Sequence, residues 1–281
     1  MRVVTFDLES VLRRDRLVVV IALGAVIVLS WAYVLAGAGM GMSAMEMTRM
    51  THAVGLGGSS QSGMQMSGMN GALVVSMWSV GYAVIAFFMW WIMMLGMMLP
   101  SAAPLLLLFA RMMRKEKEKG APYVSTGVFA LGYAVMWAAF SGVATGAQWG
   151  LESIGLLSAM MVGTSTVFGA VLLIAAGIWQ LTPLKQACLK HCRSPIGFLS
   201  SHWRPGRAGA FTMGLAHGAF CLGCCWFLMA LLFYGGIMSL YWIIGLALYV
   251  LLEKLLPAGV WFGQLTGVAL IAWGILLLLQ S

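Results

Sequence analysis

The sequence predicts an all-α protein, a polytopic transmembrane helix bundle with about seven spanning helices. Of its 281 residues, 62% are hydrophobic and only 9% are charged, and the mean hydropathy is +0.95. A water-soluble globular chain of this length does not have so apolar a composition. In addition, apolar runs of about 20 residues, the length that crosses the hydrocarbon core of a bilayer, recur along the chain. We therefore expect residues 1–281 to form a single transmembrane domain.

The apolar runs follow a polar leader over residues 1–16 that carries four arginines. The first run is longer than the apolar region of a cleavable signal peptide. Pro100 and Pro104 predict a kinked extension at the inner end of the second span. Two long polar connections are expected, an outer loop at 40–72 and an inner loop at 182–208. The predicted spans cover 17–39, 73–99, 123–149, 157–181, 210–236, 237–252 and 260–279.

The basic residues predict the orientation of these spans. With the N-terminus inside, every Lys and Arg except Arg49 falls in an inner segment. This agrees with the positive-inside rule and predicts an N-terminus inside and a C-terminus outside. The expected location is a bacterial cytoplasmic (inner) membrane, which the family resemblance given below implies. The net charge of +8 is thereby explained by topology, and we expect no nucleic-acid partner.

One predicted span carries three thiols and an imidazole. At roughly 100° per residue, His217, Cys221, Cys224 and Cys225 fall on one face of a helix, with Met213 one turn earlier. Ionisable groups at membrane depth turn toward the bundle interior and need a partner there, and a metal ion is one such partner. The alternative is that the cysteines are buried packing residues and that His217 hydrogen-bonds a neighbouring carbonyl.

The outer loop is rich in methionine within a Gly/Ser-rich context that we expect to be too polar to pack a core. Thioethers are soft ligands that select Cu(I), and they need no deprotonation in an oxidising compartment. The alternative is a disordered spacer or an adaptable binding surface. The candidate ligands here are Met42, Met45, Met47, Met50, His52, Met64 and Met66.

Two further regions contain candidate ligands. In the span MWWIMMLGMMLP, Met93 and Met97 lie one turn apart, although a methionine stripe at this spacing is also typical of core packing. In the inner loop LTPLKQACLKHCRSP, Thr182-Pro183 predicts a helix start and Ser194-Pro195 predicts its end. This short helix places its thiols on one face, where they would hold Cu(I) or Zn or simply pack at the interface. Its candidate ligands are Cys188, His191 and Cys192.

Three phrases of the sequence carry a family resemblance: MWWIMMLGMMLPSAAPL, QLTPLKQACLKHCRSP and GLAHGAFCLGCCWFLM. Together they resemble a bacterial family of integral membrane proteins of unknown function that are described as predicted metal-binding proteins. The resemblance covers roughly residues 77–256 and leaves out the methionine-rich loop. It implies metal binding but no established reaction.

These observations predict a copper(I)-handling integral membrane protein that captures, delivers or transports the ion. The alternative is a non-catalytic accessory or assembly subunit of a membrane metalloenzyme complex. We find no nucleotide-binding motif or nucleophile elbow, and His217 is the only one of four histidines in a predicted span. We therefore expect no nucleotide and no haem, and an enzymatic role is left open but not favoured. The expected partners are the lipid bilayer, the metal ion, and a metal-donor protein or larger membrane complex.

The predicted topology orders these sites along the membrane normal. Cu(I) would then pass from the outer thioethers to Met93 and Met97 and on to the thiolates. It would keep at least one ligand throughout its passage across the hydrocarbon core. This relay requires the helix with Met93 and Met97 to pack against the helix with His217 and Cys221.

Overall fold

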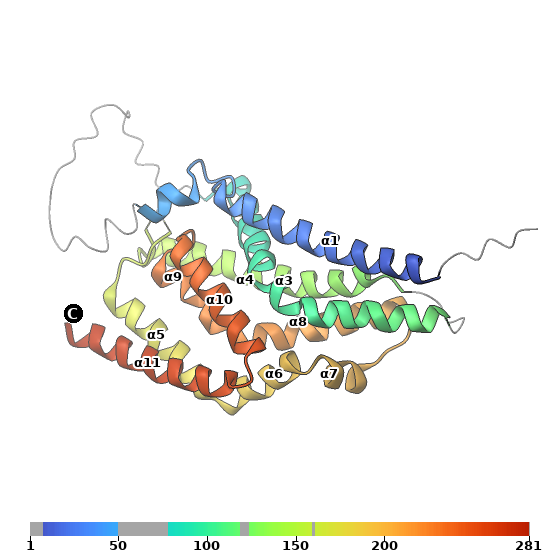
Figure 1. Cartoon of the computed structure of the whole chain (residues 1–281). Coiled ribbons are helices and arrows are strands. Elements are labelled where there is room, and N and C mark those ends of the chain that lie inside the picture. Colours follow the sequence, from blue (N-terminus) through green and yellow to red (C-terminus); the bar gives the residue numbers. More distant parts are fainter. Residues whose placement is uncertain (1–7, 50–77, 119–123, 159–160, 281) are drawn as a thin grey trace, which may run out of the picture.

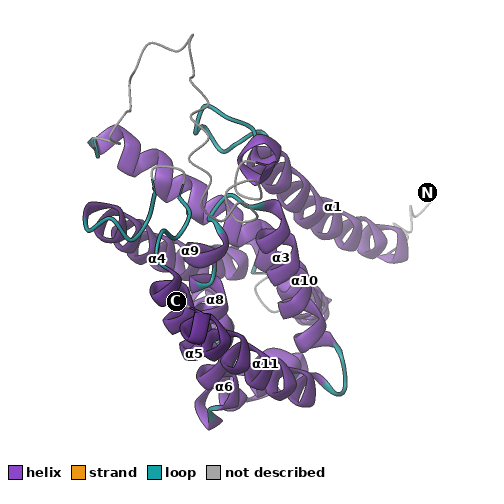
Figure 2. Ribbon diagram, turned by 90° about the vertical axis from the view of Figure 1, so that its left-hand side faces the viewer, coloured by secondary structure: helices purple, strands orange, loops and turns teal. Residues whose placement is uncertain are grey.

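The computed structural model describes residues 8–49, 78–118, 124–158 and 161–280, and this part of the chain is helical, without a β-strand (Figure 2). The prediction of an all-α fold is confirmed. The helices are α1 (Leu8–Leu35), α3 (Val80–Glu118), α4 (Thr126–Ser153), α5 (Thr166–Leu181), α6 (Pro183–Arg193), α7 (Pro195–His202), α8 (Gly206–Ala230), α9 (Leu232–Gly235), α10 (Leu240–Leu255) and α11 (Gly259–Gln280).

Among the described residues, 5 helical segments are long and apolar enough to cross a membrane: α1, α3, α4, α8 with α9, and α11. The pair α5 and α6 adds a sixth if it is one span, bent by 66°. Taken separately, α5 and α10 have 16 residues each, which is short for a span. Several membrane-length helices are thus present, while the count of seven and the orientation stay predictions.

The inner loop folds as its capping residues predict. Thr182 accepts a hydrogen bond from the backbone N–H of Lys185, and Pro183 is the first residue of α6. Ser194 ends α6 and caps α7, which begins at Pro195. Because proline lacks an N–H that the first helical turn would leave unpaired anyway, it is well suited to both starts. The segment between α5 and α8 is therefore helical over most of its length.

The helices pack in pairs, with α5 against α11, α4 against α8, and α1 against α3 (Figure 1). The α4–α8 pair is in backbone contact, because each helix places a glycine against the other. A Cβ on Gly132 of α4 would lie 2.2 Å from the Phe211 carbonyl oxygen, and one on Gly214 of α8 would lie 2.1 Å from the Phe129 carbonyl oxygen. Neither position has room for a side chain.

Replacing Gly214 by alanine is expected to lower the thermal stability of the protein in detergent. The added methyl group meets a backbone carbonyl that cannot rotate away, and overpacking of this kind typically costs about 1–3 kcal/mol. Gly142→Ala on α4 is the matched control, since a Cβ there has no neighbour within 4 Å and alanine favours helix. Equal melting temperatures for the two variants would contradict the close contact.

Candidate metal centre

The cysteine-bearing face of α8 points into the bundle. Cys221, Cys224 and Cys225 are each 0% exposed, His217 is 4% exposed, and Met213 is 1% exposed. The sharing of one buried face follows from the helical period, since these residues recur every three or four positions. The sulfurs and the imidazole therefore do not face lipid.

Residues of α4 and α10 contact the thiol of Cys221 on α8, and both of them also bond to α3. Cys221 Sγ lies 3.2 Å from the Tyr133 hydroxyl of α4 and 3.0 Å from Lys254 Nζ of α10. Lys254 also donates to Ser101 Oγ of α3 at 3.1 Å, and Tyr133 donates to the Met98 carbonyl of α3 at 3.4 Å. A buried ammonium against a sulfur is charge-assisted when the sulfur is a thiolate. The site thus supplies a counter-charge for one deprotonated cysteine.

Lys254 was not among the predicted site residues, since the Glu253–Lys254 pair was expected in a connection between two spans. Both residues lie in the last turns of α10, 0% and 6% exposed respectively. Consecutive helical residues point about 100° apart, and the two side chains have different partners. The available signal was a pair of charges at the end of an apolar run, which is also typical of a loop.

Glu253 belongs to a second buried polar group. Its Oε1 accepts from Lys185 Nζ of α6, and the two side chains are 0% and 1% exposed. Lys185 also donates to Gln180 Oε1, and Gln180 Nε2 donates to the Tyr249 hydroxyl at 2.7 Å. This ion pair ties α6 to α10 beside the cysteines.

The thiols of α6 join those of α8. Cys192 lies next to Cys221 and Cys224, close enough for its thiol to interact with theirs. Cys188 packs against Gly223 of α8, where a Cβ would lie 2.8 Å from its Sγ. Glycine at position 223 therefore lets α6 approach closely. We call Cys192, Cys221, Cys224 and Cys225 the cysteine cluster.

The thiols of the cluster are hydrogen-bonded to protein groups. Cys224 Sγ and Cys225 Sγ each donate to the Cys221 carbonyl oxygen at 3.0 Å. Within the described ranges, no three His, Cys, Asp or Glu side chains already converge as a metal-binding group. Thiol side chains change direction by rotation about a single χ1 bond between staggered positions. Joint binding of one ion by this cluster therefore requires such rotation.

The imidazole of His217 is held by aromatic rings. It stacks on Tyr133 with a centroid separation of 5.7 Å and meets Phe198 edge-on at 5.2 Å. Its buried Nδ1 has no hydrogen-bond partner, so the alternative in which this atom bonds a neighbouring carbonyl is not observed. A buried polar atom without a partner is costly unless a ligand satisfies it.

His191 lies in a different setting from the thiols of its helix. Its ring stacks on Phe220 with centroids 4.2 Å apart and lies 5.7 Å from the ring of His202. Its Nδ1 lies 2.9 Å from the Ala187 carbonyl oxygen. The structure thus places His191 in a ring cluster with His202, a residue that the sequence did not single out.

Met93 and Met97 are buried, 1% and 2% exposed, in the hydrophobic core, which agrees with the packing alternative. The main partners of α3 are α1 and α4, and those of α8 are α4 and α6. The relay requires α3 to pack directly on α8. Among the described residues, this pair is not one of the main helix contacts. Tyr133 and Lys254 link the two helices instead.

The start of the methionine-rich loop is folded. Ser43 and Glu46 form a capping box, with Ser43 N–H donating to Glu46 Oε2 at 3.0 Å and Glu46 N–H donating to Ser43 Oγ at 3.3 Å. The hydrogen bonds from Ser43 lower the pKa of the exposed Glu46 carboxyl. This helical turn is docked on the bundle, because Thr48 Oγ1 accepts from the Leu240 N–H at 2.9 Å.

After this docking, the predicted thioether ligands differ in how far they are exposed to solvent. Met45 is 52% exposed, Met42 is partly buried, and Met47 is only 8% exposed. The expectation that this stretch is too polar to pack a core is wrong for Met47, which belongs to the core. Copper capture by the loop stays a prediction. Met50, His52, Met64 and Met66 lie outside the described residues.

Comparison with curated proteins and with solved structures finds no match. A family model described as a copper chaperone does match, and its matched region includes α4 to α10 and thus the whole cysteine cluster. The chain belongs to this PpoB2 copper chaperone family, whose model covers residues 87–277.

Proposed function

We propose that the protein is an integral membrane copper chaperone that binds Cu(I) as cargo at the cysteine cluster and passes it to a partner. The observation that carries this proposal is the meeting of α6 and α8, which brings Cys192 against Cys221 and Cys224. Sulfur ligands from two separate helices can release an ion by moving one helix relative to the other. A site on one rigid helix does not offer this route.

The chemistry of the donors supports Cu(I) in particular. Thiolates and thioethers are soft ligands that select Cu(I), while oxygen-activating Cu(II) sites are rich in imidazole. Among the described residues near the cluster, His217 is the imidazole that lies on the same helix face as the thiols. This donor set favours holding and transferring the ion over catalysis, and it fits delivery to a metalloenzyme complex as well as to a soluble acceptor.

Lys254 supports the same proposal through charge. Its ammonium contacts Cys221 Sγ at 3.0 Å, in a setting where an unpaired charge is strongly disfavoured. A Cu(I) ion carries the same single positive charge as this ammonium. The cation can therefore balance the thiolate in place of Lys254, with the displaced amine giving up its proton to remain neutral.

Cys192→Ser is expected to weaken Cu(I) binding by about 10- to 100-fold, since it removes the sulfur that α6 contributes to the cluster. The affinity is measured by anaerobic titration of the purified protein against a chromophoric Cu(I) chelator. Cys188→Ser on the same helix serves as the comparison, because this sulfur packs on Gly223 and should affect binding less.

X-ray absorption at the copper edge provides the second measurement. We expect sulfur scattering in the parent and a loss of one sulfur neighbour in Cys192→Ser. A parent protein that binds no stoichiometric Cu(I) under reducing conditions, or binds it equally without Cys192, would overturn the proposed function.

A further inference from the structure

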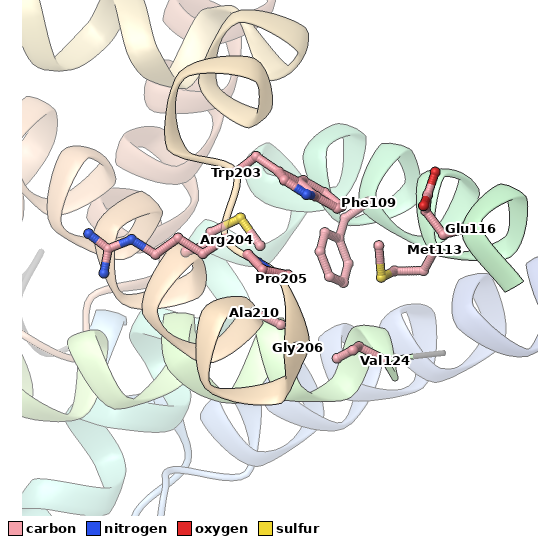
Figure 3. A pocket seen from close by; sticks show the side chains of 10 residues that line it. Phe109, Met113, Glu116, Val124, Trp203, Arg204, Pro205, Gly206 and Ala210 are labelled. Atoms are coloured by element: carbon pink, nitrogen blue, oxygen red, sulfur yellow. The ribbon is translucent and has the colours of Figure 1, made fainter. Parts of the chain in front are cut away.

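A cavity of about 130 Å³ lies between the end of α3 and the start of α8 (Figure 3). Two methionines from different helices, Met113 of α3 and Met213 of α8, line it together with mostly apolar groups, and Glu116 and Arg204 border it. The Arg204 side chain points away from the centre of the cavity (Figure 3). The cavity thus brings two thioether-bearing side chains together within a largely apolar wall. The residues that line it are Phe109, Met113, Glu116, Val124, Trp203, Arg204, Pro205, Gly206, Ala210 and Met213.

The chemistry of this cavity suits a soft monovalent cation. Thioethers bind Cu(I) without deprotonation and have little affinity for hard ions such as Mg²⁺ or Ca²⁺. Met113 and Met213 are 5% and 1% exposed, so an ion bound between them would be shielded from water. Buried methionines also fill irregular space in protein cores. The position of Met213 on α8, in register with His217 and Cys221, favours a role as a metal ligand over packing alone.

Met213 begins a row of soft donors on α8. It lies one turn before His217, which lies one turn before Cys221, and residues four apart share a helix face about 6 Å from one another. Each step leads from the cavity toward the cysteine cluster. The middle member, His217, is the buried imidazole whose Nδ1 has no hydrogen-bond partner. That unpartnered atom is an independent indication that a ligand visits this row.

Aromatic rings separate the cavity from His217. Phe109 lines the cavity, and its ring lies 5.0 Å from that of Phe129, which in turn lies 6.4 Å from the imidazole. Phe109 and Phe129 are both 0% exposed. The path from cavity to imidazole is therefore closed by packed rings, and the passage of an ion requires them to move.

We propose that this cavity is the port through which Cu(I) reaches the cysteine cluster, with Met113 and Met213 as the first ligands and His217 as the next. This inference rests on the proposed function and adds the route to it. Met113 and Met213 act on the rate of loading, because the ion leaves them for stronger thiolate ligands. The affinity of the cluster itself does not depend on them.

Loading kinetics provide the first test. In the double variant Met113→Leu/Met213→Leu, which keeps the apolar volume, Cu(I) transfer from a chelator in stopped flow should be about ten-fold slower while the equilibrium affinity is unchanged. Met238→Leu, a buried methionine outside the cavity that is 2% exposed, should load at the parental rate. Parental loading by the double variant would overturn the port and leave the proposed function intact.

A direct measurement separates the two proposals. Ag(I) is a redox-inert substitute for Cu(I), and it should shift the ¹³C-methyl resonances of Met113 and Met213, assigned through their leucine variants. If these resonances shift in a protein whose cysteines bind no Cu(I), the cavity is a soft-metal site and the cysteine cluster is not the destination. If they do not move at any Ag(I) concentration that occupies the cysteines, the port is refuted.

Discussion

Replacing Cys221 and Cys224 together by serine is expected to lower the affinity for Cu(I) by about a thousand-fold, or about 4 kcal/mol. These two sulfurs are the ones that the α6 thiol meets, and Cys221 is also the sulfur beside the Lys254 ammonium. A hydroxyl has nearly the size of a thiol but is a poor ligand for a soft ion. The variant should therefore lose binding without losing the fold.

The control for this variant lies on the same helix. Met229 is 0% exposed and follows Cys225 by one turn, so Met229→Leu alters packing on α8 while keeping all thiols. We expect parental affinity from it in the same chelator competition. Near-parental affinity of the double serine variant, with an unchanged melting temperature, would place the copper site elsewhere in the chain.

The second large effect is expected on stability, at the ion pair between Lys185 and Glu253. Lys185→Met leaves the carboxylate of Glu253 buried without its cation, and breaking a buried pair in this way costs about 3–5 kcal/mol. The Oε2 atom of Glu253 already lacks a hydrogen-bond partner, so the loss of Lys185 would leave both carboxylate oxygens without the cation. Thermal unfolding in detergent should show a large loss of stability.

The double variant Lys185→Met/Glu253→Met tests the cause of that loss. Replacing both members by apolar groups of similar volume removes the unpaired charge, and such replacements are often neutral or stabilising. We expect the double variant to be more stable than Lys185→Met alone. If both variants unfold at the same temperature, the charge of Glu253 is not responsible.

The elements that the sequence predicts well depend on local chemistry. The start of α6 at Pro183 follows from the capping residue Thr182, and the shared face of His217 and Cys221 follows from the helical period. Neither requires knowledge of which helices are neighbours. For the same reason the burial of the cysteine face could be expected from the cost of exposing ionisable groups to lipid.

The junction of α6 with the cysteine helix could not be predicted in this way. It depends on Gly223, which admits Cys188, and on the glycines that hold α4 against α8, and a single sequence does not say which glycine faces which helix. Lys254 was missed because a charge at the end of an apolar run is more typical of a loop. Met47 was misjudged because its docking through Thr48 and Leu240 links segments far apart in the chain.

The glycine contact between α4 and α8 has a mechanical consequence. Two helices whose backbones touch, as at Gly132 and Gly214, cannot slide or rotate past each other without collision, so together they act as a fixed frame. By contrast, α6 leaves α5 at a bend of 66° and carries Cys192 at its far end. A movement of this arm about Thr182 would separate its thiol from those of the frame, and it would also have to break the ion pair between Lys185 and Glu253 that ties α6 to α10.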